Sequence, residues 1–244
     1  MRPVSKGATP NENGFYPYDS AKSDLVSRLD RYCSYCERRL ATNIAVEHLI
    51  PKGGEHGDPE LENDWRNFLI ACTNCNSCKG SKQVLFNEMV FPDRDNTFVA
   101  FEYHRDGSVS PSSNLSNIER QLAANTLELT GLDKPVQRFR DSNDQIVSLD
   151  RKTQRMDAFL VALDALEEYQ RNCTASMKRM VIKLAKAEGF FSIWMKVFMQ
   201  YPEIKTLLIE EHIGTSSSGC FCLLTGDTVT PAPNPDGMEH GGKV

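Results

Sequence analysis

The chain has 244 residues, of which 40% are hydrophobic and 25% are charged, a balance typical of a soluble globular protein. Its formal net charge of −5 argues against indiscriminate nucleic-acid binding, so any contact with DNA must use a local basic face. No stretch approaches the roughly 18 apolar residues of a membrane span, and residues 1–14 lack the apolar core of a signal peptide. We therefore expect no membrane association and a cytoplasmic location.

Two elements are expected before the first cysteines. Residues 1–20 are rich in Pro, Asn and Gly, show no period, and predict an extended arm. Over residues 20–30 the apolar positions recur at helical spacing, which predicts a short helix.

Four of the eight cysteines form two C-x-x-C pairs, Cys33 with Cys36 and Cys72 with Cys75. Matched pairs of this spacing are typical of structural zinc sites, in which each pair grips the ion from a tight turn. Because nothing in the sequence predicts export, thiolate ligands to a metal fit these residues better than disulfides. The sequence therefore predicts one zinc ion held by these four cysteines.

Three further cysteines raise the question of a ligand role. Cys78 follows the second pair closely, but four thiolates already complete a tetrahedral site. Cys220 and Cys222 form a C-x-C pair that offers metal ligands without a partner pair nearby. Cys78 is therefore not expected to bind the zinc, and the role of the C-x-C pair stays open.

The chain between the two cysteine pairs predicts a strand, a loop, a second strand and a helix. Residues 43–50 are β-branched and alternate loosely, which indicates a strand, and Pro51 with the glycines after it forces a loop. The apolar residues 65–70 predict the second strand, and the second cysteine pair turns into a helix. The polar residues placed on or beside these elements are Glu47 and His48 at the end of the first strand, Asn67, and Asn76, Lys79 and Lys82 on the helix.

This order of residues beside the cysteine pairs resembles the HNH endonucleases of the ββα-metal fold. At the third position Asn76 replaces the histidine, as in the HNN variants of that superfamily. The phrases EHLIPK and CNSCKG, the later FEYHRDGSVSP and the helical C-terminal half look like the HNH proteins of retron-associated and Septu-type anti-phage defence systems. The resemblance implies a bacterial defence effector that acts with a companion ATPase, with the helical half as candidate docking surface.

The chemistry expected of such a site can be assigned to residues. Hydrolysis of a phosphodiester needs an attacking hydroxide, a cation at the developing charge, and stabilisation of the leaving oxygen. Neutral His48 suits the general base, since its ordinary pKa lies near the working pH. Asn67 would orient the imidazole, directly or by shaping the loop around it. Glu47 and Asn76 offer hard oxygen ligands, for which Mg²⁺ or Mn²⁺ is expected rather than zinc.

Other interpretations of these residues remain open. Four cations are candidate phosphate contacts: Lys52, Arg66, Lys79 and Lys82. The alternative for the lysines is a helix face exposed to solvent, which is the more usual situation. The substrate is expected to be DNA, with RNA not excluded. The alternative function is a zinc-knuckle module that binds nucleic acid or protein without cutting, which has no need for a Glu-His pair.

The rest of the chain predicts a hairpin and then helices. Alternation over residues 98–103, a turn with Gly107 and a segment over 108–110 indicate the hairpin. Helical spacing follows, interrupted at glycines and prolines. The expected helices are 114–131, 143–173, 174–187, 190–199 and a short one after Pro202. Between residues 134 and 196, twelve Lys or Arg and eight Asp or Glu make a modest basic stripe that also fits a solvated face.

The expected class is therefore α+β, with a zinc-stapled ββα-metal HNH nuclease core and a mainly α-helical C-terminal half. The composition of the last 31 residues, rich in Ser, Gly and Pro, predicts partial disorder. The predicted organisation is an extended arm over 1–20, the nuclease core with zinc knuckle and hairpin over 21–112, a helical domain over 113–213 and a tail over 214–244.

Overall fold

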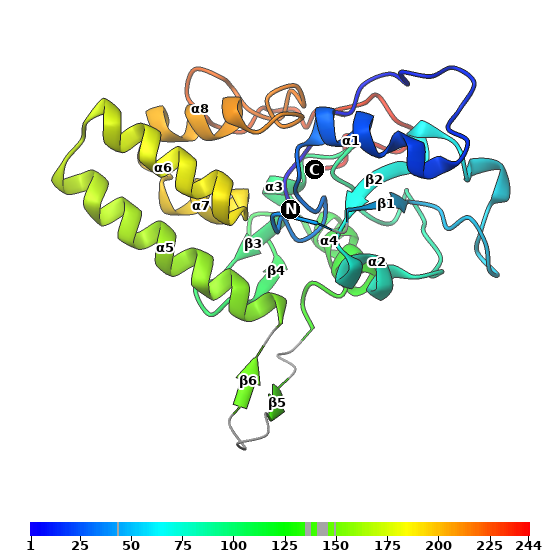
Figure 1. Ribbon diagram of the computed structural model, residues 1–244, viewed down its shortest axis with the longest axis horizontal. Coiled ribbons are helices and arrows are strands. Elements are labelled where there is room, and N and C mark those ends of the chain that lie inside the picture. Colours follow the sequence, from blue (N-terminus) through cyan, green and yellow to red (C-terminus); the bar gives the residue numbers. More distant parts are fainter. Residues whose placement is uncertain (43, 135–137, 141–145, 149) are drawn as a thin grey trace.

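The structure is a computed structural model that describes residues 1–42, 44–134, 138–140, 146–148 and 150–244 (Figure 1). Helices predominate, and the strands pair into three small antiparallel sheets of two strands each within this part of the chain, which confirms the α+β class. The helices are η1 (Tyr18–Ala21), α1 (Lys22–Leu29), η2 (Pro59–Leu61), η3 (Trp65–Asn67), α2 (Thr73–Lys79), α3 (Thr97–Ala100), α4 (Asn117–Thr130), α5 (Arg151–Arg171), α6 (Ala175–Glu188), α7 (Phe191–Val197) and α8 (Pro202–Glu211). The strands are β1 (Ala45–His48), β2 (Phe68–Ala71), β3 (Phe101–Tyr103), β4 (Val109–Pro111), β5 (Arg138–Arg140) and β6 (Ile146–Ser148).

The predicted ββα unit is present. Strand β1 runs antiparallel to β2, with His48 opposite Phe68, and β2 is buried along its whole length. Helix α2 follows directly and ends at Lys79, because Gly80 takes a positive φ of 52° that suits glycine. Lys82 therefore lies beyond the helix, not on it as predicted.

The hairpin of β3 and β4 forms, but its first strand is shorter than predicted. Residues 97–100 make a helical turn, and only Phe101–Tyr103 pair with β4. The turn buries both Thr97 and Ala100 completely. Two residues three positions apart share one face of a helix but point to opposite faces of a strand, so burial of both favours the helical turn.

The helical half follows the prediction except at the start of its longest helix. Helix α4 begins with a capping box between Ser116 and Glu119 and ends at Gly131 in the left-handed conformation. Helix α5 begins at Arg151 rather than near Asn143, a position outside the described residues. The cause is the side chain of Asp150, which caps the backbone N–H groups of the first turn, while the chain before it supplies β6.

The N-terminal segment has no helix or strand before η1, and part of it is buried. Val4 is 1% exposed, and the Lys6 ammonium donates to the Phe68 carbonyl at 2.8 Å and pairs with the Asp93 carboxylate at 2.9 Å. The N-terminal arm thus contacts the start of β2. No helix of the described ranges has the length and apolar character that crossing a bilayer requires.

The C-terminal residues 214–244 are packed, which corrects the prediction of a partly disordered tail. Asp236 accepts a hydrogen bond from the Ser5 hydroxyl at 2.7 Å, and Lys243 pairs with Asp95 at 3.0 Å. The composition suggested disorder because the segment forms no helix or strand of its own. Its backbone and side chains instead bind partners far away in the sequence, which composition does not reveal.

Candidate active site

The four predicted zinc ligands come together in one buried cluster. The sulfur atoms of Cys33, Cys36, Cys72 and Cys75 all lie within 4.8 Å of one another. The first pair lies in a turn after α1, and the second pair occupies the N-cap and first turn of α2. Four thiols at this spacing fit the donor set of a tetrahedral zinc site, as the cysteine pattern predicted.

Neighbouring chain segments hold the cluster in place. The Ser34 backbone N–H, inside the first pair, donates to the Ile70 carbonyl of β2 at 2.8 Å. Arg151 at the start of α5 donates from its guanidinium to the Cys75 sulfur at 3.2 Å. Hydrogen bonds to a ligand sulfur orient it and spread its negative charge, so the helical half contributes to this site.

The other cysteines lie outside the cluster. The Cys78 sulfur is 3.7 Å from the Arg151 guanidinium and 3.8 Å from the Lys134 ammonium, at the surface end of α2. Cys220 is buried and Cys222 is half-buried, and neither joins a metal-ligand cluster in the described part of the chain.

His48 lies half-buried at the end of β1, between two aromatic rings. Its imidazole is 4.8 Å from the Tyr18 ring and 5.2 Å from the Phe68 ring. Its Nε2 lies 2.8 Å from the Glu62 carbonyl oxygen, and because a carbonyl only accepts, Nε2 carries the proton and Nδ1 keeps its lone pair. Burial lowers the pKa of His48, and the Glu62 carbonyl opposes this shift. The imidazole is therefore neutral near pH 7, with one nitrogen able to accept a proton.

Asn67 shapes the loop after His48 rather than hydrogen bonding to the imidazole. Its side-chain oxygen accepts from the Ile50 N–H at 2.7 Å, and its amide nitrogen donates to the carbonyls of Ile50 at 2.9 Å and Leu61 at 3.2 Å. These three bonds tie the beginning and the end of the loop to the start of β2. The same loop carries the Glu62 carbonyl that fixes the His48 tautomer.

Glu47 is buried, in surroundings that differ from those of His48. Side chains of adjacent strand residues point to opposite faces, and the Glu47 carboxylate accordingly meets Tyr35 and Lys79 instead of the aromatic rings around His48. The Lys79 ammonium and the Tyr35 hydroxyl each lie 3.2 Å from the same oxygen, Oε1. Burial raises the pKa of Glu47, while Lys79 lowers it. The other oxygen, Oε2, has no hydrogen-bond partner among the described residues.

The side-chain oxygens of Glu47 and Asn76 are chemically suited to a divalent cation, but Glu47 is closed off from solvent in this conformation. Glu47 Oε2 and the amide oxygen of half-buried Asn76 on α2 are hard ligands without a partner in the described chain, which suits Mg²⁺ or Mn²⁺. Glu47 is only 1% exposed, and Lys79 beside it is 2% exposed. A hydrated cation and a phosphate reach Glu47 only when Lys79 or the chain around it moves.

The candidate phosphate contacts divide into two groups. Three of them are exposed and already bound within the chain: Lys52 pairs with Glu62 at 3.0 Å, Arg66 pairs with Asp64 at 2.7 Å, and Lys82 donates to the Glu128 carbonyl at 3.2 Å. Lys79 is different, because it is buried against Glu47. Lys79 therefore does not lie on a solvated face, and the contact of all four cations with phosphate stays a prediction.

Sequence reasoning missed several neighbours of these residues. The ring of Tyr18, the hydroxyl of Tyr35 and the carbonyl of Glu62 all contact Glu47 or His48. No motif could have found the Glu62 carbonyl, because every residue carries one. Tyr18 and Tyr35 lie in the arm and in the first cysteine pair, where their type alone carries no sign of a role.

Comparisons with known proteins agree with this geometry. The HNH endonuclease family model matches residues 33–82. A protein of Vibrio cholerae serotype O1 biovar El Tor, named "Retron Vc95 putative HNH endonuclease", is 28% identical over 110 residues, which cover 42% of this chain and 52% of that protein. The Septu protein PtuB of Bacillus thuringiensis is 28% identical over 132 residues, which cover 52% of this chain and 47% of that protein. The chain thus spans about half the length of each relative.

The matched region coincides with the part of the molecule described above. Its first residue is Cys33 and its last is Lys82, so it contains both cysteine pairs, Glu47 and His48, Asn67 and α2. Residues 33–82 are therefore similar to the HNH endonuclease family, and the resemblance to the retron-associated and Septu-type HNH proteins is confirmed.

Proposed function

We propose that this chain is a metal-dependent endonuclease that hydrolyses phosphodiester bonds in DNA, with His48 as the general base. The observation that carries the proposal is the protonation and hydrogen bonding of that imidazole. Its Nε2 is bound to the Glu62 carbonyl at 2.8 Å and its pKa is lowered by burial, so Nδ1 is available as an acceptor at neutral pH. A zinc-knuckle binding module has no use for a histidine held in this way.

The proposed reaction begins with a water molecule beside His48. Nδ1 takes a proton from the water, and the hydroxide attacks phosphorus while the bond to the 3′ oxygen breaks. The imidazolium that forms has Nε2 still donating to Glu62, so the ring keeps its orientation during proton transfer. Asn67 acts as a positioning residue, because its three hydrogen bonds fix the loop that carries this carbonyl.

Glu47 and Asn76 are the proposed ligands of a divalent cation, Mg²⁺ or Mn²⁺. When bound, such a cation stabilises negative charge on the phosphate and on the leaving oxygen. The support for these ligands is the free oxygen Oε2 of Glu47 and the unengaged amide of Asn76 in the described chain. Lys79 offsets the charge of Glu47 when the cation is absent. The proposed ion of the four cysteines is zinc, with a structural role.

The resemblance extends the proposal to the cellular role. The resemblance to the retron-associated and Septu-type HNH proteins implies an effector of anti-phage defence that works with an ATPase, and the proposed location is the cytoplasm. The helical half, α4 to α8, is the proposed docking surface for that partner. Co-expression and pull-down from the native operon measure this association. A chain that is fully active alone and ignores the neighbouring ATPase would contradict it.

The test of the nuclease proposal is nicking of supercoiled plasmid with Mg²⁺ or Mn²⁺, compared with EDTA. His48→Ala should lower the cleavage rate by roughly 10²- to 10⁴-fold, the usual contribution of a general base. His56→Ala is the matched control, since His56 is exposed in the loop after β1 and should cut like the wild type. A parallel arm with RNA of the same sequence distinguishes the two substrates. Unchanged cleavage by His48→Ala sinks the assignment.

A further inference from the structure

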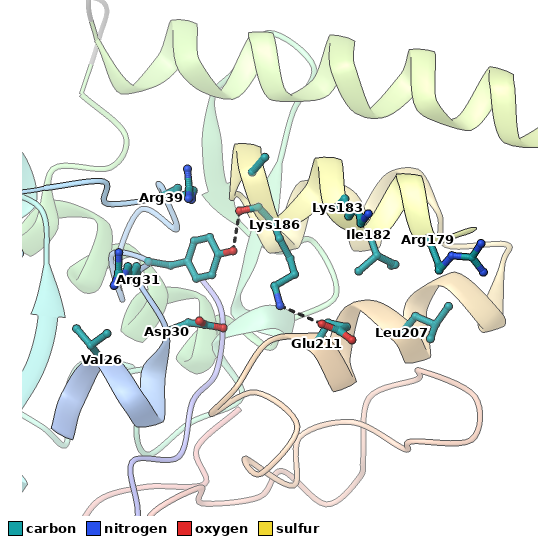
Figure 2. A pocket seen from close by; sticks show the side chains of 12 residues that line it. Val26, Asp30, Arg31, Arg39, Arg179, Ile182, Lys183, Lys186, Leu207 and Glu211 are labelled. Atoms are coloured by element: carbon teal, nitrogen blue, oxygen red, sulfur yellow. Dashed lines mark hydrogen bonds and ion pairs between the residues drawn. The ribbon is translucent and has the colours of Figure 1, made fainter. Parts of the chain in front are cut away.

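A second site lies between the nuclease segment and the helical half. A cavity of about 690 Å³ is bounded by the end of α1, the residues that flank the first cysteine pair, and helices α6 and α8 (Figure 2). This volume falls in the range of small-molecule pockets. None of the proposed catalytic residues lines it, so the cavity is separate from the site around His48.

The lining of the cavity is strongly basic in a chain whose net charge is negative. Five cations line it, and only two acidic side chains, Asp30 and Glu211, accompany them. Figure 2 shows two of the cations beside the cysteine turn and the others along α6. The five are Arg31, Arg39, Arg179, Lys183 and Lys186.

Most of these cations have no internal partner. Lys186 pairs with Glu211 at 2.9 Å, and this pair spans α6 and α8 in Figure 2. The other four cations form no ion pair with any described residue, although the chain has more acidic than basic side chains. Like charges gathered without counter-ions repel one another, so an anion bound among them relieves that repulsion.

The remaining lining combines three apolar side chains, from α1, α6 and α8, with a free acceptor. Val26, Ile182 and Leu207 supply an apolar wall. The Asp30 carboxylate oxygen Oδ2 has no hydrogen-bond partner among the described residues. A hydroxyl or amino group on a ligand would donate to such an oxygen, whereas a bare polyanion would not.

We propose that this pocket binds the phosphate groups of a nucleotide, either free or within a nucleic-acid strand. Three of the five cations are arginines, whose planar guanidinium groups bind phosphate oxygens through two parallel hydrogen bonds. The apolar wall accommodates a base or sugar, and Asp30 accepts from its polar hydrogens. Arg31 and Arg39 flank the first cysteine pair, so a bound ligand touches the segment that holds the metal cluster.

The test is direct binding to the zinc-loaded full chain without added Mg²⁺ or Mn²⁺, so that its result does not depend on cleavage. The probe is MANT-ATP, a fluorescent ATP analogue, followed by competition with ATP, a thymidine decanucleotide and a glutamate decapeptide. Arg179→Ala with Lys183→Ala should weaken probe binding by about tenfold or more. Both residues are exposed and form no ion pair in the described chain, and Arg179 loses only an exposed hydrogen bond to the Ser176 hydroxyl at 3.1 Å, so thermal unfolding should be unchanged.

The matched control removes the same charge from α5 and α6 outside the pocket. Arg171 pairs with Glu168 at 2.7 Å and Lys178 pairs with Glu203 at 3.8 Å, and neither lines the cavity. The double variant Arg171→Ala, Lys178→Ala should bind the probe like the wild type. Competition by ATP alone identifies a free nucleotide, and competition by the decanucleotide identifies a strand.

Three results would overturn the proposal. The first is no binding of MANT-ATP or the decanucleotide up to about 1 mM, the weak limit of specific affinity. The second is equal loss of affinity in the pocket variant and the control variant, which would mean a general charge effect. The third is competition by the glutamate peptide as strong as that by ATP, which would assign the pocket to an acidic peptide segment.

Discussion

The cysteine cluster and the site around Glu47 and His48 lie in the same fifty-residue segment but treat their polar groups in opposite ways. The four sulfurs converge on one point and are buried, and the Cys75 sulfur accepts a hydrogen bond from Arg151. At the second site a carboxylate oxygen, an imidazole nitrogen and an amide are left without a partner in the described chain. Native proteins rarely leave a buried polar atom such as Glu47 Oε2 unpaired, so this oxygen supports the proposed cation site.

The strongest way to break this comparison is to remove one sulfur. Cys75→Ser should lose the zinc and unfold at a much lower temperature, because the binding energy of a structural zinc, about 10 to 16 kcal/mol, is largely folding energy. Elemental analysis and thermal unfolding measure both effects. Cys173→Ser is the control, since Cys173 is exposed and outside the cluster, and it should keep about one zinc per chain. A Cys75→Ser chain with normal zinc and normal melting would show that the cluster is not structural.

The second prediction concerns the buried ion pair. Glu47→Gln should keep the zinc but lose cleavage, and it should destabilise the fold by about 3 to 5 kcal/mol because Lys79 is left buried without its partner charge. Adding Lys79→Met removes that uncompensated charge. The double variant should therefore regain most of the stability without regaining cleavage. Denaturant unfolding, zinc analysis and plasmid nicking on both variants separate the two effects. If Glu47→Gln loses the zinc, Glu47 belongs to the zinc site, and the proposed division into two metal sites is wrong.

Asn67 tests whether the loop belongs to the catalytic site. Asn67→Ala removes all three hydrogen bonds to the Ile50 and Leu61 backbone and should cost about 1 to 3 kcal/mol, since buried backbone groups lose their partners. Cleavage should fall further than stability explains, because the Glu62 carbonyl no longer holds His48. Comparing kcat at a temperature where the variant is fully folded measures this. Full activity in a folded Asn67→Ala chain would leave the residue a purely structural role.

An effect confined to acidic pH comes from a buried polar atom with no proposed part in catalysis. His212 is 1% exposed and donates from Nδ1 to the Leu208 carbonyl at 2.6 Å, and burial lowers its pKa to about 3. The unfolded chain binds a proton on this residue below its ordinary pKa of about 6.5, whereas the folded chain does not. Stability should therefore be complete above that value and fall on acidification, by at most about 1.4 kcal/mol per pH unit.

His212→Asn isolates that effect, because its amide can still donate to the Leu208 carbonyl. Urea unfolding between pH 7 and 4 should show a shallower loss of stability in the variant than in the wild type. If the free energy of unfolding falls equally with pH in both chains, titratable groups other than His212 cause the loss of stability in acid. His212 Nε2 also lacks a partner among the described residues. Because His212 has no proposed part in catalysis, plasmid nicking at pH 7 should be unchanged.

The sequence predicted the parts of this site that depend on local spacing. Two C-x-x-C pairs and the order Glu47, His48, Asn67, Asn76 were sufficient to predict the cluster and the ββα unit, because each motif sits at the end of an element. The partners that decide the behaviour of these residues come from elsewhere. Lys79 looked like a surface lysine, since its burial depends on a carboxylate 32 positions earlier in the chain.

Two larger errors have the same physical origin. The tail over 214–244 was expected to be partly disordered because its composition lacks a periodic apolar face, yet Lys243 and Asp236 bind partners more than a hundred residues away. The early start expected for α5 followed apolar spacing alone. The Asp150 cap sets the real boundary, and the β5–β6 pair before it involves only three residues per strand.

The guanidinium of Arg151 connects residues 33–82 to parts of the chain far outside that segment. This side chain joins the Cys75 sulfur to the carbonyls of Thr130 and Gly131, so the ends of α4 and the start of α5 meet at a zinc ligand. An excised fragment of residues 33–82 would lose that donor to the Cys75 sulfur. A substitution at Arg151 would change zinc affinity, by about 10- to 100-fold on the usual scale of such partners, without touching substrate.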